Sequence, residues 1–236
     1  MKLSHPPFLW NDTPQAMCAR YTLRKRSLAD VADAVDPEVS ADDEHLYKPS
    51  YNVARTDVAW VVIFGADRRV LRPARWKYTT GAKRILVNIR SESVAVFGRF
   101  RDVSSSHRCA VVTDGFYEWS GSGEPVWFHA SDDGLVLLGG LPQLAKVPGA
   151  HPRFSVLTTR PNGLVAKPHD RMPVIVGPKQ LDEWLTGDAA AALKLLSPSP
   201  AGVLVATDVS NYVNSVKHDD PGCVAPRAEG GQSELF

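Results

Sequence analysis

The sequence predicts an α+β fold in one domain, built mostly on antiparallel β-sheet. Three observations lead to this prediction. Short β-rich runs recur with turns between them, three segments have helical character, and strands do not alternate regularly with helices as a doubly wound α/β fold requires. The chain has 236 residues, of which 44% are apolar and 22% charged. This length and composition allow one sizeable core and exclude a disordered chain, a collagen-like repeat and a disulfide scaffold.

Regular structure is predicted to begin near Tyr21. Residues 1–16 have mixed polarity and no periodicity, which is typical of an appendage. From Tyr21 the alternation of residue types predicts a strand. A short amphipathic helix is expected next, because Ser27 can act as its N-cap and Asp30 can complete a capping box. The acidic residues 36–49 are expected to form a loop.

Beyond residue 50 the chain is predicted to contain a series of short strands and two helical segments. Apolar residues fall along one side of residues 91–100, which predicts a helix. A clearer helix is expected to start at Pro178 and to continue through an Ala-rich stretch to Leu196, because proline suits the first helical turn. The predicted strands lie at 58–65, 85–87, 109–113, 126–129, 135–138, 153–159 and 203–206.

Cysteine usage and hydropathy indicate a cytoplasmic protein. The three cysteines are isolated in the sequence, which is typical of reduced thiols. No apolar run approaches the roughly 18 residues of a membrane span, and the N-terminus has no apolar core of signal-peptide type. No pair of cysteines or histidines has metal-ligand spacing, and the glycines at 121 and 123 lack the features of a phosphate loop. We therefore expect no metal, no nucleotide cofactor and no membrane partner.

Positive charge is concentrated in one part of the chain. The formal net charge is only +1, but residues 68–108 carry eleven basic side chains against two acidic ones, a local balance of +9. Arginine supplies most of these charges, and its guanidinium group suits forked contacts with phosphate. The stretch is therefore either a nucleic-acid-binding face or a solvated basic surface.

Cys18 is a candidate nucleophile because it directly follows Met17. If Cys18 becomes the first residue, it presents both an α-amine and a thiol, with reference pKa values of about 7.7–8.0 and about 8.5. Such a 1,2-aminothiol attacks an aldehyde first through nitrogen and then through sulfur, and closes a five-membered thiazolidine. The alternative is a small hydrophobic residue buried in the core.

Three further polar residues stand in contexts that suit catalysis, each with a structural alternative. Glu118 lies among aromatic residues, where desolvation favours general acid–base work, or it is a salt-bridged residue at a strand end. His169 lies beside Asp170 and Arg171 between two prolines, and is either a proton shuttle or a surface histidine. Asn88 ends an apolar strand, and either holds a polar adduct or caps the following helix.

The chain carries a series of short motifs that together resemble one protein family. The most specific are the DGFYEW string at 114–119 and the HDRMP string at 169–173, combined with the Met-Cys pair. The others are MCARY at 17–21, YNVA at 51–54, NIRSE at 88–92, RC at 108–109, LTT at 157–159 and DDPGC at 219–223. In this order they resemble the SRAP family, the SOS response-associated peptidases, whose members are also called abasic-site processing proteins. The resemblance covers residues 17 to about 226.

The resemblance implies an SRAP domain at 17–226 with a barrel-like antiparallel core and flanking helices, preceded by an extension at 1–16 and followed by a tail at 227–236. It implies single-stranded DNA as the partner and a covalent thiazolidine crosslink to abasic sites in the DNA damage response. By position, Cys18 would be the nucleophile, Asn88 would hydrogen-bond the adduct, Glu118 would assist proton transfers and reversal, and His169 would protonate the opening sugar oxygen.

Further residues are assigned to DNA by the same resemblance. Arg20, Arg90 and Arg171 would bind phosphates, and Trp76 and Trp119 would stack on bases or wedge between them. We expect a monomer that associates with the nucleoid when it is bound to DNA. Strand scission of the lyase type and self-processing by a peptidase activity are also implied by the family.

The sequence departs from the family pattern near the reacting residue. Ala19 stands where the family has glycine, and residues 54–56 and 75–80 differ from the usual blocks, which bears on the shape of the DNA channel. Residues 1–16 precede the Met-Cys pair, and an acylated Cys18 cannot form a thiazolidine. We expect either that translation starts at Met17 and the methionine is removed, or that the segment is cleaved, and we favour the first.

Two other classes of function stay open at this stage. A cysteine peptidase would use Cys18, His169 and Glu118 as nucleophile, base and orienting group, and would need no free amine. A non-catalytic single-stranded DNA-binding module would rely on phosphate contacts and stacking, and would form no covalent product.

Overall fold

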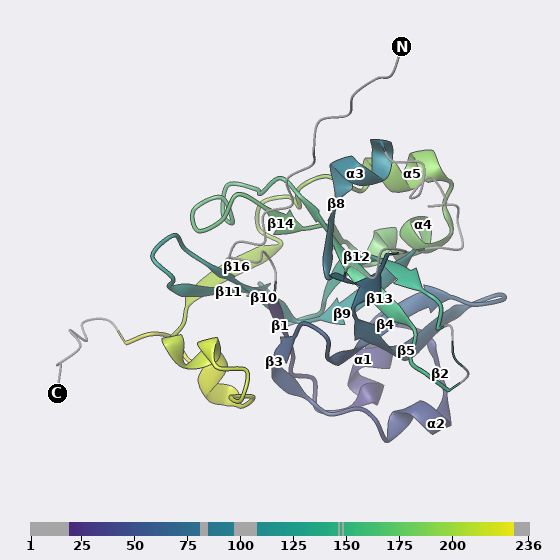
Figure 1. Cartoon of the computed structure of the whole chain (residues 1–236), viewed down its shortest axis with the longest axis horizontal. Helices are drawn as coiled ribbons and strands as arrows, with labels where there is room; N and C mark the ends of the chain where they lie inside the picture. The colour runs from purple at the N-terminus through teal and green to yellow at the C-terminus, as the bar shows by residue number, and fades with distance from the viewer. Residues whose placement is uncertain (1–18, 81–84, 97–107, 146, 148, 229–236) are drawn as a thin grey trace, which may run out of the picture.

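The computed structural model describes residues 19–80, 85–96, 108–145, 147 and 149–228, and β-strands dominate it (Figure 1). The helices are α1 (Leu28–Val35), α2 (Ala41–Glu44), α3 (Ser91–Val96), α4 (Leu181–Thr186) and α5 (Ala189–Lys194), with short 3₁₀ turns η2 (Pro178–Gln180), η3 (Asn211–Asn214) and η4 (Pro221–Val224). The strands are β1 (Arg20–Leu23), β2 (Glu38–Val39), β3 (Ser50–Ala54), β4 (Val58–Phe64), β5 (Arg69–Trp76), β6 (Tyr78–Thr79), β7 (Ile85–Leu86), β8 (Asn88–Arg90), β9 (Cys109–Thr113), β10 (Gly115–Trp119), β11 (Pro125–Ala130), β12 (Val136–Gln143), β13 (Arg153–Thr159), β14 (Met172–Pro173), β15 (Ile175–Val176) and β16 (Leu204–Asp208).

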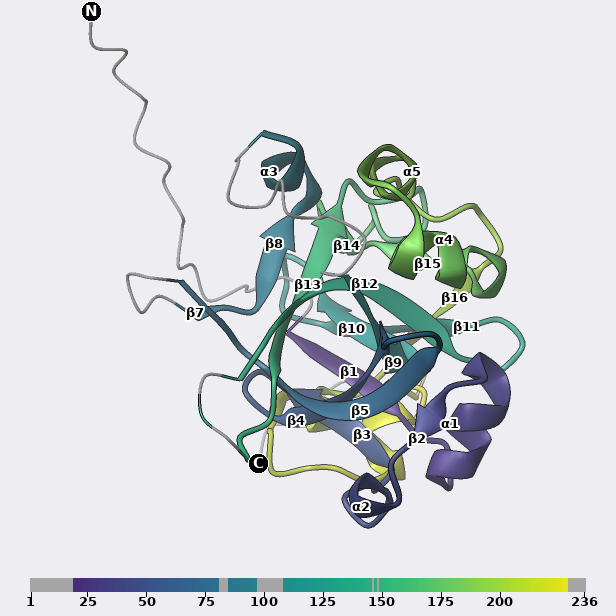
Figure 2. The ribbon, with the colours of Figure 1, turned by 90° about the vertical axis from the view of Figure 1, so that its right-hand side faces the viewer.

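Two main sheets organise the described strands. The smaller has the order β16-β11-β10-β1-β3 and is antiparallel throughout. The larger follows the path β14-β13-β12-β9-β4-β5-β2, with β15 paired to β12 and β8 paired to β13. A parallel contact between β13 and β5 brings two strands of this path together, so the larger sheet curls around its interior (Figure 2). The fold is α+β with mostly antiparallel pairing, which confirms the predicted class.

Alternation along the strands divides the core into layers. In β9, Val111 belongs to an apolar cluster that also contains Phe116 of the smaller sheet and Phe154 of β13. The neighbouring Ala110 belongs instead to a cluster that contains Trp184 of α4 and the apolar face of α1. Successive side chains of a strand point to opposite faces, so the larger sheet is buried against the smaller sheet on one side and against helices on the other.

Local sequence signals explain the helix ends. The Ser27 side chain accepts the Asp30 backbone N–H and the Asp30 carboxylate accepts the Ser27 N–H, which forms the predicted capping box of α1. The helix expected from Pro178 instead forms three pieces, η2, α4 and α5. Gly187 ends α4 with a hydrogen bond to Glu183, and Asp188 then caps α5.

Several predicted boundaries are wrong. The segment 36–49 is not a loop throughout, since it contains β2 and α2, the latter capped by Ser40. The DGFYEW string forms strand β10 after Asp114, and β3 and β5 are further strands that the periodicity did not reveal. Of the helix expected at 91–100, the part from residue 97 lies outside the described residues. None of the helices in the described part of the chain is both long enough and apolar enough to cross a membrane.

Candidate active site

Glu118 lies in the middle of the smaller sheet. Strand β10 pairs with β11 on one side and β1 on the other, and the side chain of Glu118 is 1% exposed. Phe116, two residues earlier on the same face of the strand, packs into the cluster between the sheets, whereas Tyr117 packs into a separate cluster on the opposite face. Glu118 is therefore a buried carboxylate on the side of the smaller sheet that faces the larger one.

The start of β1 runs beside Glu118. The antiparallel register pairs Arg20 with Tyr117 and Tyr21 with Phe116. If the same pairing continues one residue towards the N-terminus, Ala19 lies opposite Glu118. Cys18, the predicted nucleophile, lies outside the described residues, as does the segment before it. In the sequence it is separated from Ala19 by one peptide bond.

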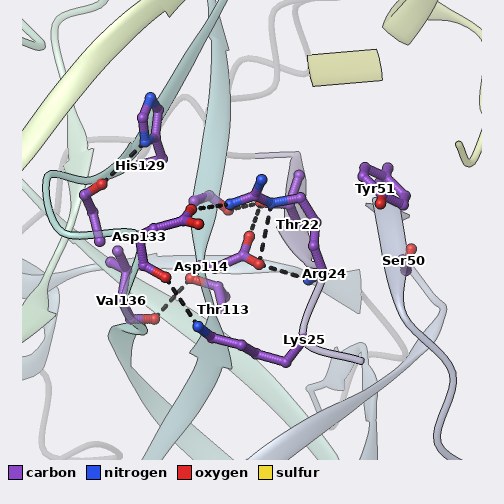
Figure 3. A network of polar contacts seen from close by, with 12 residues as sticks. Thr22, Arg24, Lys25, Ser50, Tyr51, Thr113, Asp114, His129, Asp133 and Val136 are labelled. Carbon is purple, nitrogen blue, oxygen red and sulfur yellow. Dashed lines mark hydrogen bonds and ion pairs between the residues drawn. The ribbon is translucent and has the colours of Figure 1, made fainter. Parts of the chain in front are cut away.

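A buried polar network fixes the relative positions of β1 and β10 (Figure 3). Asp114, which is 2% exposed, accepts hydrogen bonds from the Thr22 hydroxyl and from the Arg24 backbone N–H, the latter at 2.6 Å. The Arg24 guanidinium lies 3.2 Å from the same carboxylate and 2.9 Å from Asp133, and it stacks over Trp127. These bonds join the end of β1 to the residue that precedes β10, which holds Glu118 in register.

Asn88 belongs to the larger sheet. It begins β8, which runs parallel to β13 with Asn88 opposite Val156, and its Oδ1 atom is buried. Asn88 lies three residues before the first residue of α3, so it does not occupy the N-cap position that the alternative interpretation required. In both views β8 and β14 lie above β1 and β10 (Figures 1 and 2).

His169 lies in the loop between β13 and β14. Its side chain is 14% exposed, and its Nδ1 atom accepts the Arg171 backbone N–H at 3.1 Å. The same Nδ1 atom lies 3.2 Å from the Asp170 carboxylate. One nitrogen cannot accept the first bond and donate the second at the same time, so Nδ1 makes one of these two contacts at a time. A ring that carries its proton on Nε2 accepts the Arg171 N–H, and a ring that carries a proton on Nδ1 can donate to Asp170.

An ion pair that the sequence analysis missed anchors this loop. Both Glu92 oxygens accept hydrogen bonds from the Arg171 guanidinium, at 2.6 and 2.8 Å, and Arg171 also donates to the Thr158 carbonyl at 2.7 Å. Hydrogen bonding from Arg171 lowers the pKa of Glu92 from 4.5 to about 2. The opposite charges in the NIRSE and HDRMP motifs were visible in the sequence, but no spacing rule joins residues so far apart.

Two of the residues assigned to DNA have other roles in the structure. Trp76 is 1% exposed, stacks on Phe154 and donates its indole N–H to the Val87 carbonyl. It is a core residue and offers no face to a base. Arg171 is 7% exposed and is held by Glu92, so its guanidinium is not free for phosphate. The structure therefore corrects both assignments: Trp76 does not present a ring for base stacking, and Arg171 does not present a free guanidinium for phosphate.

The other three assigned residues retain surface contact with solvent. Arg90 is exposed at the end of β8. Trp119 is half-buried and donates its indole N–H to Asn214 at 2.7 Å. Arg20 is also half-buried, but its guanidinium already bonds the Asn52 side chain and two carbonyls near η3. Arg90 and Trp119 are therefore the better candidates for contact with a nucleic acid.

The basic stretch 68–108 does not form one continuous face among the described residues. Arg108 is buried and donates to the Trp184 and Gly187 carbonyls at the end of α4. Arg69 pairs with Asp182 at 2.8 Å, and exposed Arg68 lies near Glu38. The stretch at 97–107, with two further arginines, lies outside the described residues. Arg69 and Arg108 of this stretch therefore make contacts within the protein.

The described cysteines are poor nucleophiles. Cys109 and Cys223 are free and buried, and burial raises the pKa of both thiols. The described residues contain no group of three or more His, Cys, Asp or Glu side chains that could hold a metal ion.

Comparisons with known proteins support the family that the motifs indicated. The chain is 30% identical over 225 residues to abasic site processing protein YoqW of Bacillus subtilis, covering 87% of this chain and 97% of that protein. It is 24% identical over 223 residues to abasic site processing protein YedK of Escherichia coli, covering 89% of this chain and 100% of that protein. It is 26% identical over 238 residues to abasic site processing protein HMCES of Gallus gallus, covering 81% and 70%.

Solved structures share the fold. A protein from Bacteroides thetaiotaomicron superposes with a TM-score of 0.74 at 18% identity, covering 89% of this chain and all of that one. A protein from Bordetella bronchiseptica superposes with a TM-score of 0.68 at 22% identity, covering 82% of this chain and all of that one. The model of the family described as SOS response associated peptidase (SRAP) matches residues 17–216, a range that includes β1, β8, β10 and the His169 loop. The chain therefore belongs to the SRAP family.

Proposed function

We propose that this protein processes abasic sites in single-stranded DNA by forming a covalent link through the amine and thiol of Cys18. Membership of the SRAP family and similarity to proteins named for abasic site processing support the proposal. The observation that carries it structurally is the buried Glu118 carboxylate, which the extended register sets opposite Ala19, the residue just before β1. This position suits a group that moves protons at an amine carried by the preceding residue.

The proposed chemistry joins an aldehyde to a 1,2-aminothiol. The α-amine of Cys18 adds to the aldehyde carbon of the ring-opened deoxyribose, and loss of one water gives a Schiff base. The thiol then adds to the same carbon, forming a C–S bond while the thiol proton ends on nitrogen. The thiazolidine product has lost one water relative to protein and DNA, and no oxidant or metal takes part.

The described residues would serve distinct steps of this reaction. Glu118 would accept a proton from the ammonium form of Cys18 and return one when the link reverses. Cationic His169, oriented by Asp170 through Nδ1, would donate its Nε2 proton to the sugar oxygen as the ring opens. Asn88 would hydrogen-bond the adduct. Cys109 and Cys223 are disfavoured as nucleophiles because both thiols are buried with raised pKa.

A free amine is required, so the segment before Cys18 must be absent or removed. Hydrolysis of the bond between Met17 and Cys18 would consume one water and release the amine. We propose that the protein itself catalyses this cleavage in chains that carry the segment, which would account for the peptidase in the family name. The same Schiff base would permit strand scission of the lyase type.

Arg90 and Trp119 would contribute to binding of the single strand. Exposed Arg90 can neutralise a phosphate, and the half-buried Trp119 can stack on a base. We expect Arg90→Ala to reduce affinity for an undamaged oligonucleotide and to lower the salt slope by about 0.7. Arg68→Ala is the matched control, because Arg68 is an exposed arginine in the turn before β5 that lies near Glu38 of β2 and Asp67 of the same turn.

The deciding experiment uses two chains, one starting at Met17 and one at Met1. Each is mixed with a single-stranded oligonucleotide that carries one abasic site, and products are examined on a denaturing gel and by intact mass. We expect a covalent product only when Cys18 is the first residue, with the summed mass less one water. Cys18→Ala should abolish it, Cys223→Ser should not, and Glu118→Gln should slow it.

Three outcomes would contradict the proposal. If neither chain gives a covalent product, non-covalent binding of single-stranded DNA would be the favoured function. Peptide cleavage without a crosslink, and with no need for a free amine, would favour the cysteine peptidase. A crosslink that also forms on an abasic analogue without an aldehyde would refute the thiazolidine chemistry.

A further inference from the structure

A cavity of about 490 Å³ lies between β1, β3 and β4. This volume falls in the range of roughly 300–1,000 Å³ that small-molecule sites occupy. Its described lining residues include none of Asn88, Glu118 and His169. We call it the β1–β4 cavity, and its lining is unusual in three respects.

The rim of the β1–β4 cavity is apolar and exposed. Leu46, Val58 and Val216 all line it, with exposed fractions of 41%, 38% and 61%. They come from three separate parts of the chain, beside α2, at the start of β4 and after η3. Scattered exposed aliphatic residues need no explanation, but three that meet at one opening form a surface suited to an apolar partner.

Tyr21 lines the cavity and carries a buried hydroxyl. The residue is 1% exposed, and its OH atom makes no hydrogen bond to any residue that the structure describes. Its ring is fixed against Trp76, with the centroids 5.1 Å apart. A buried hydroxyl that lacks a partner carries a desolvation penalty, so a ligand that donates to it or accepts from it removes that penalty.

A carboxylate of the same cavity acts on this hydroxyl. Burial, followed by the charge of Asp57, raises the pKa of Tyr21. One Asp57 oxygen accepts the Ala54 N–H at 2.9 Å. The second lining carboxylate, Asp219, accepts three donors from residues 50–52 through one oxygen. Among the described lining residues Lys48 is the only cation, so two carboxylates stand against one ammonium and the charge balance of this lining is negative.

We propose that the β1–β4 cavity binds a small primary ammonium ligand with an aromatic or aliphatic body. The ammonium group would lie between Asp57 and the Tyr21 hydroxyl, which can accept one of its protons. The body would pack on Trp60 and the apolar rim. This site is distinct from the proposed crosslinking chemistry, since it uses neither Cys18 nor Glu118.

The test is an NMR titration of the ¹⁵N-labelled protein with phenethylammonium. Its matched counterpart is 3-phenylpropionate, which has a similar body and the opposite charge. We expect saturable shifts of backbone amides around Tyr21, Asp57 and Trp60 with phenethylammonium alone. Tyr21→Phe and Asp57→Asn should each weaken binding about fivefold or more, as expected for one lost hydrogen bond or charge contact.

Two controls keep the result interpretable. Asp67→Asn removes an exposed carboxylate outside the cavity and should leave binding unchanged. Tyr21→Phe keeps the ring that packs on Trp76 and removes only a hydroxyl without a partner, so its fold should be intact, as thermal unfolding would verify. Equal binding of both probes, shifts located elsewhere, no saturation, or full affinity in Tyr21→Phe would each overturn the proposal.

Discussion

The Glu92–Arg171 pair offers the sharpest test of how the His169 loop is held. Arg171 is nearly buried and makes two bonds to Glu92, one to the Thr158 carbonyl, and one through its backbone to His169. Glu92→Gln keeps the size of the side chain and one acceptor oxygen but removes the charge. We therefore expect this substitution to destabilise the protein at neutral pH and to loosen the His169 loop.

The magnitude follows from the pKa of Glu92, which hydrogen bonding from Arg171 lowers from 4.5 to about 2. At about 1.36 kcal/mol for each pKa unit, the lowered pKa corresponds to a stabilisation of the folded state of at most roughly 3.4 kcal/mol. The Glu92 side chain is 54% exposed, so solvent screening reduces that figure substantially. We expect Glu92→Gln to lower the free energy of unfolding by about 1.5 kcal/mol at pH 7.

The pH dependence has a definite sign. A carboxylate whose pKa is lower in the folded state than in the unfolded state stabilises the fold fully above its unfolded pKa. The contribution of Glu92 is therefore complete above pH 4.5 and disappears as the pH falls towards about 2. The stability difference between the native protein and Glu92→Gln should shrink over this interval.

Urea unfolding at several pH values between 7 and 2.5 would measure this difference. Other carboxylates titrate in both proteins, so their effects cancel when the two curves are subtracted. Glu183→Gln is the matched control, because Glu183 is an exposed carboxylate on α4, and it should change stability by less than about 0.5 kcal/mol. A difference for Glu92→Gln that is absent at pH 7, or that stays constant down to pH 2.5, would refute the charge-based argument.

Three other substitutions test the framework around the site, each by urea unfolding at pH 7. Asp114→Asn should cost about 2–3 kcal/mol, because Asp114 is buried and accepts bonds from Thr22 and Arg24. Arg108→Met should cost a similar roughly 2–3 kcal/mol, since two carbonyls at the end of α4 lose their donor. Gly115→Ala should cost more than about 1 kcal/mol, because its Cβ would lie 2.7 Å from the Phe128 carbonyl oxygen. A change below about 0.5 kcal/mol would contradict the reasoning in each case.

Features that depend on neighbouring residues could be predicted from the sequence. The capping box of α1 needs only Ser27 and Asp30, and the structure has it. Strand β13 occupies the predicted residues 153–159, because a run of alternating and β-branched residues bounded by turns is a local signal. The order of motifs likewise indicated the family from the sequence alone.

Features that depend on distant parts of the chain could not be predicted in this way. Trp76 lies in a motif position associated with DNA, yet its environment is set by Phe154 and the carbonyl of Val87. Arg108 contributed to a basic stretch, but residues of α4 far along the chain determine that it is buried. Local charge counts therefore overestimated the basic surface, since they do not distinguish an exposed guanidinium from one that satisfies buried carbonyls.

The positions of Arg90 and Glu118 indicate that DNA binding and the proposed reaction with DNA depend on different residues. Arg90 is exposed at the end of β8, whereas Glu118 is buried in the middle of the smaller sheet. A solvent-exposed cation acts on phosphates at the surface and is screened by salt, while a buried carboxylate acts only on groups brought next to it. Under the proposed function, Arg90→Ala should therefore weaken binding and leave the crosslinking rate at saturating DNA unchanged. Glu118→Gln should leave affinity for undamaged DNA unchanged and slow the reaction, and a substitution that changed both quantities equally would show that the two regions act as one site.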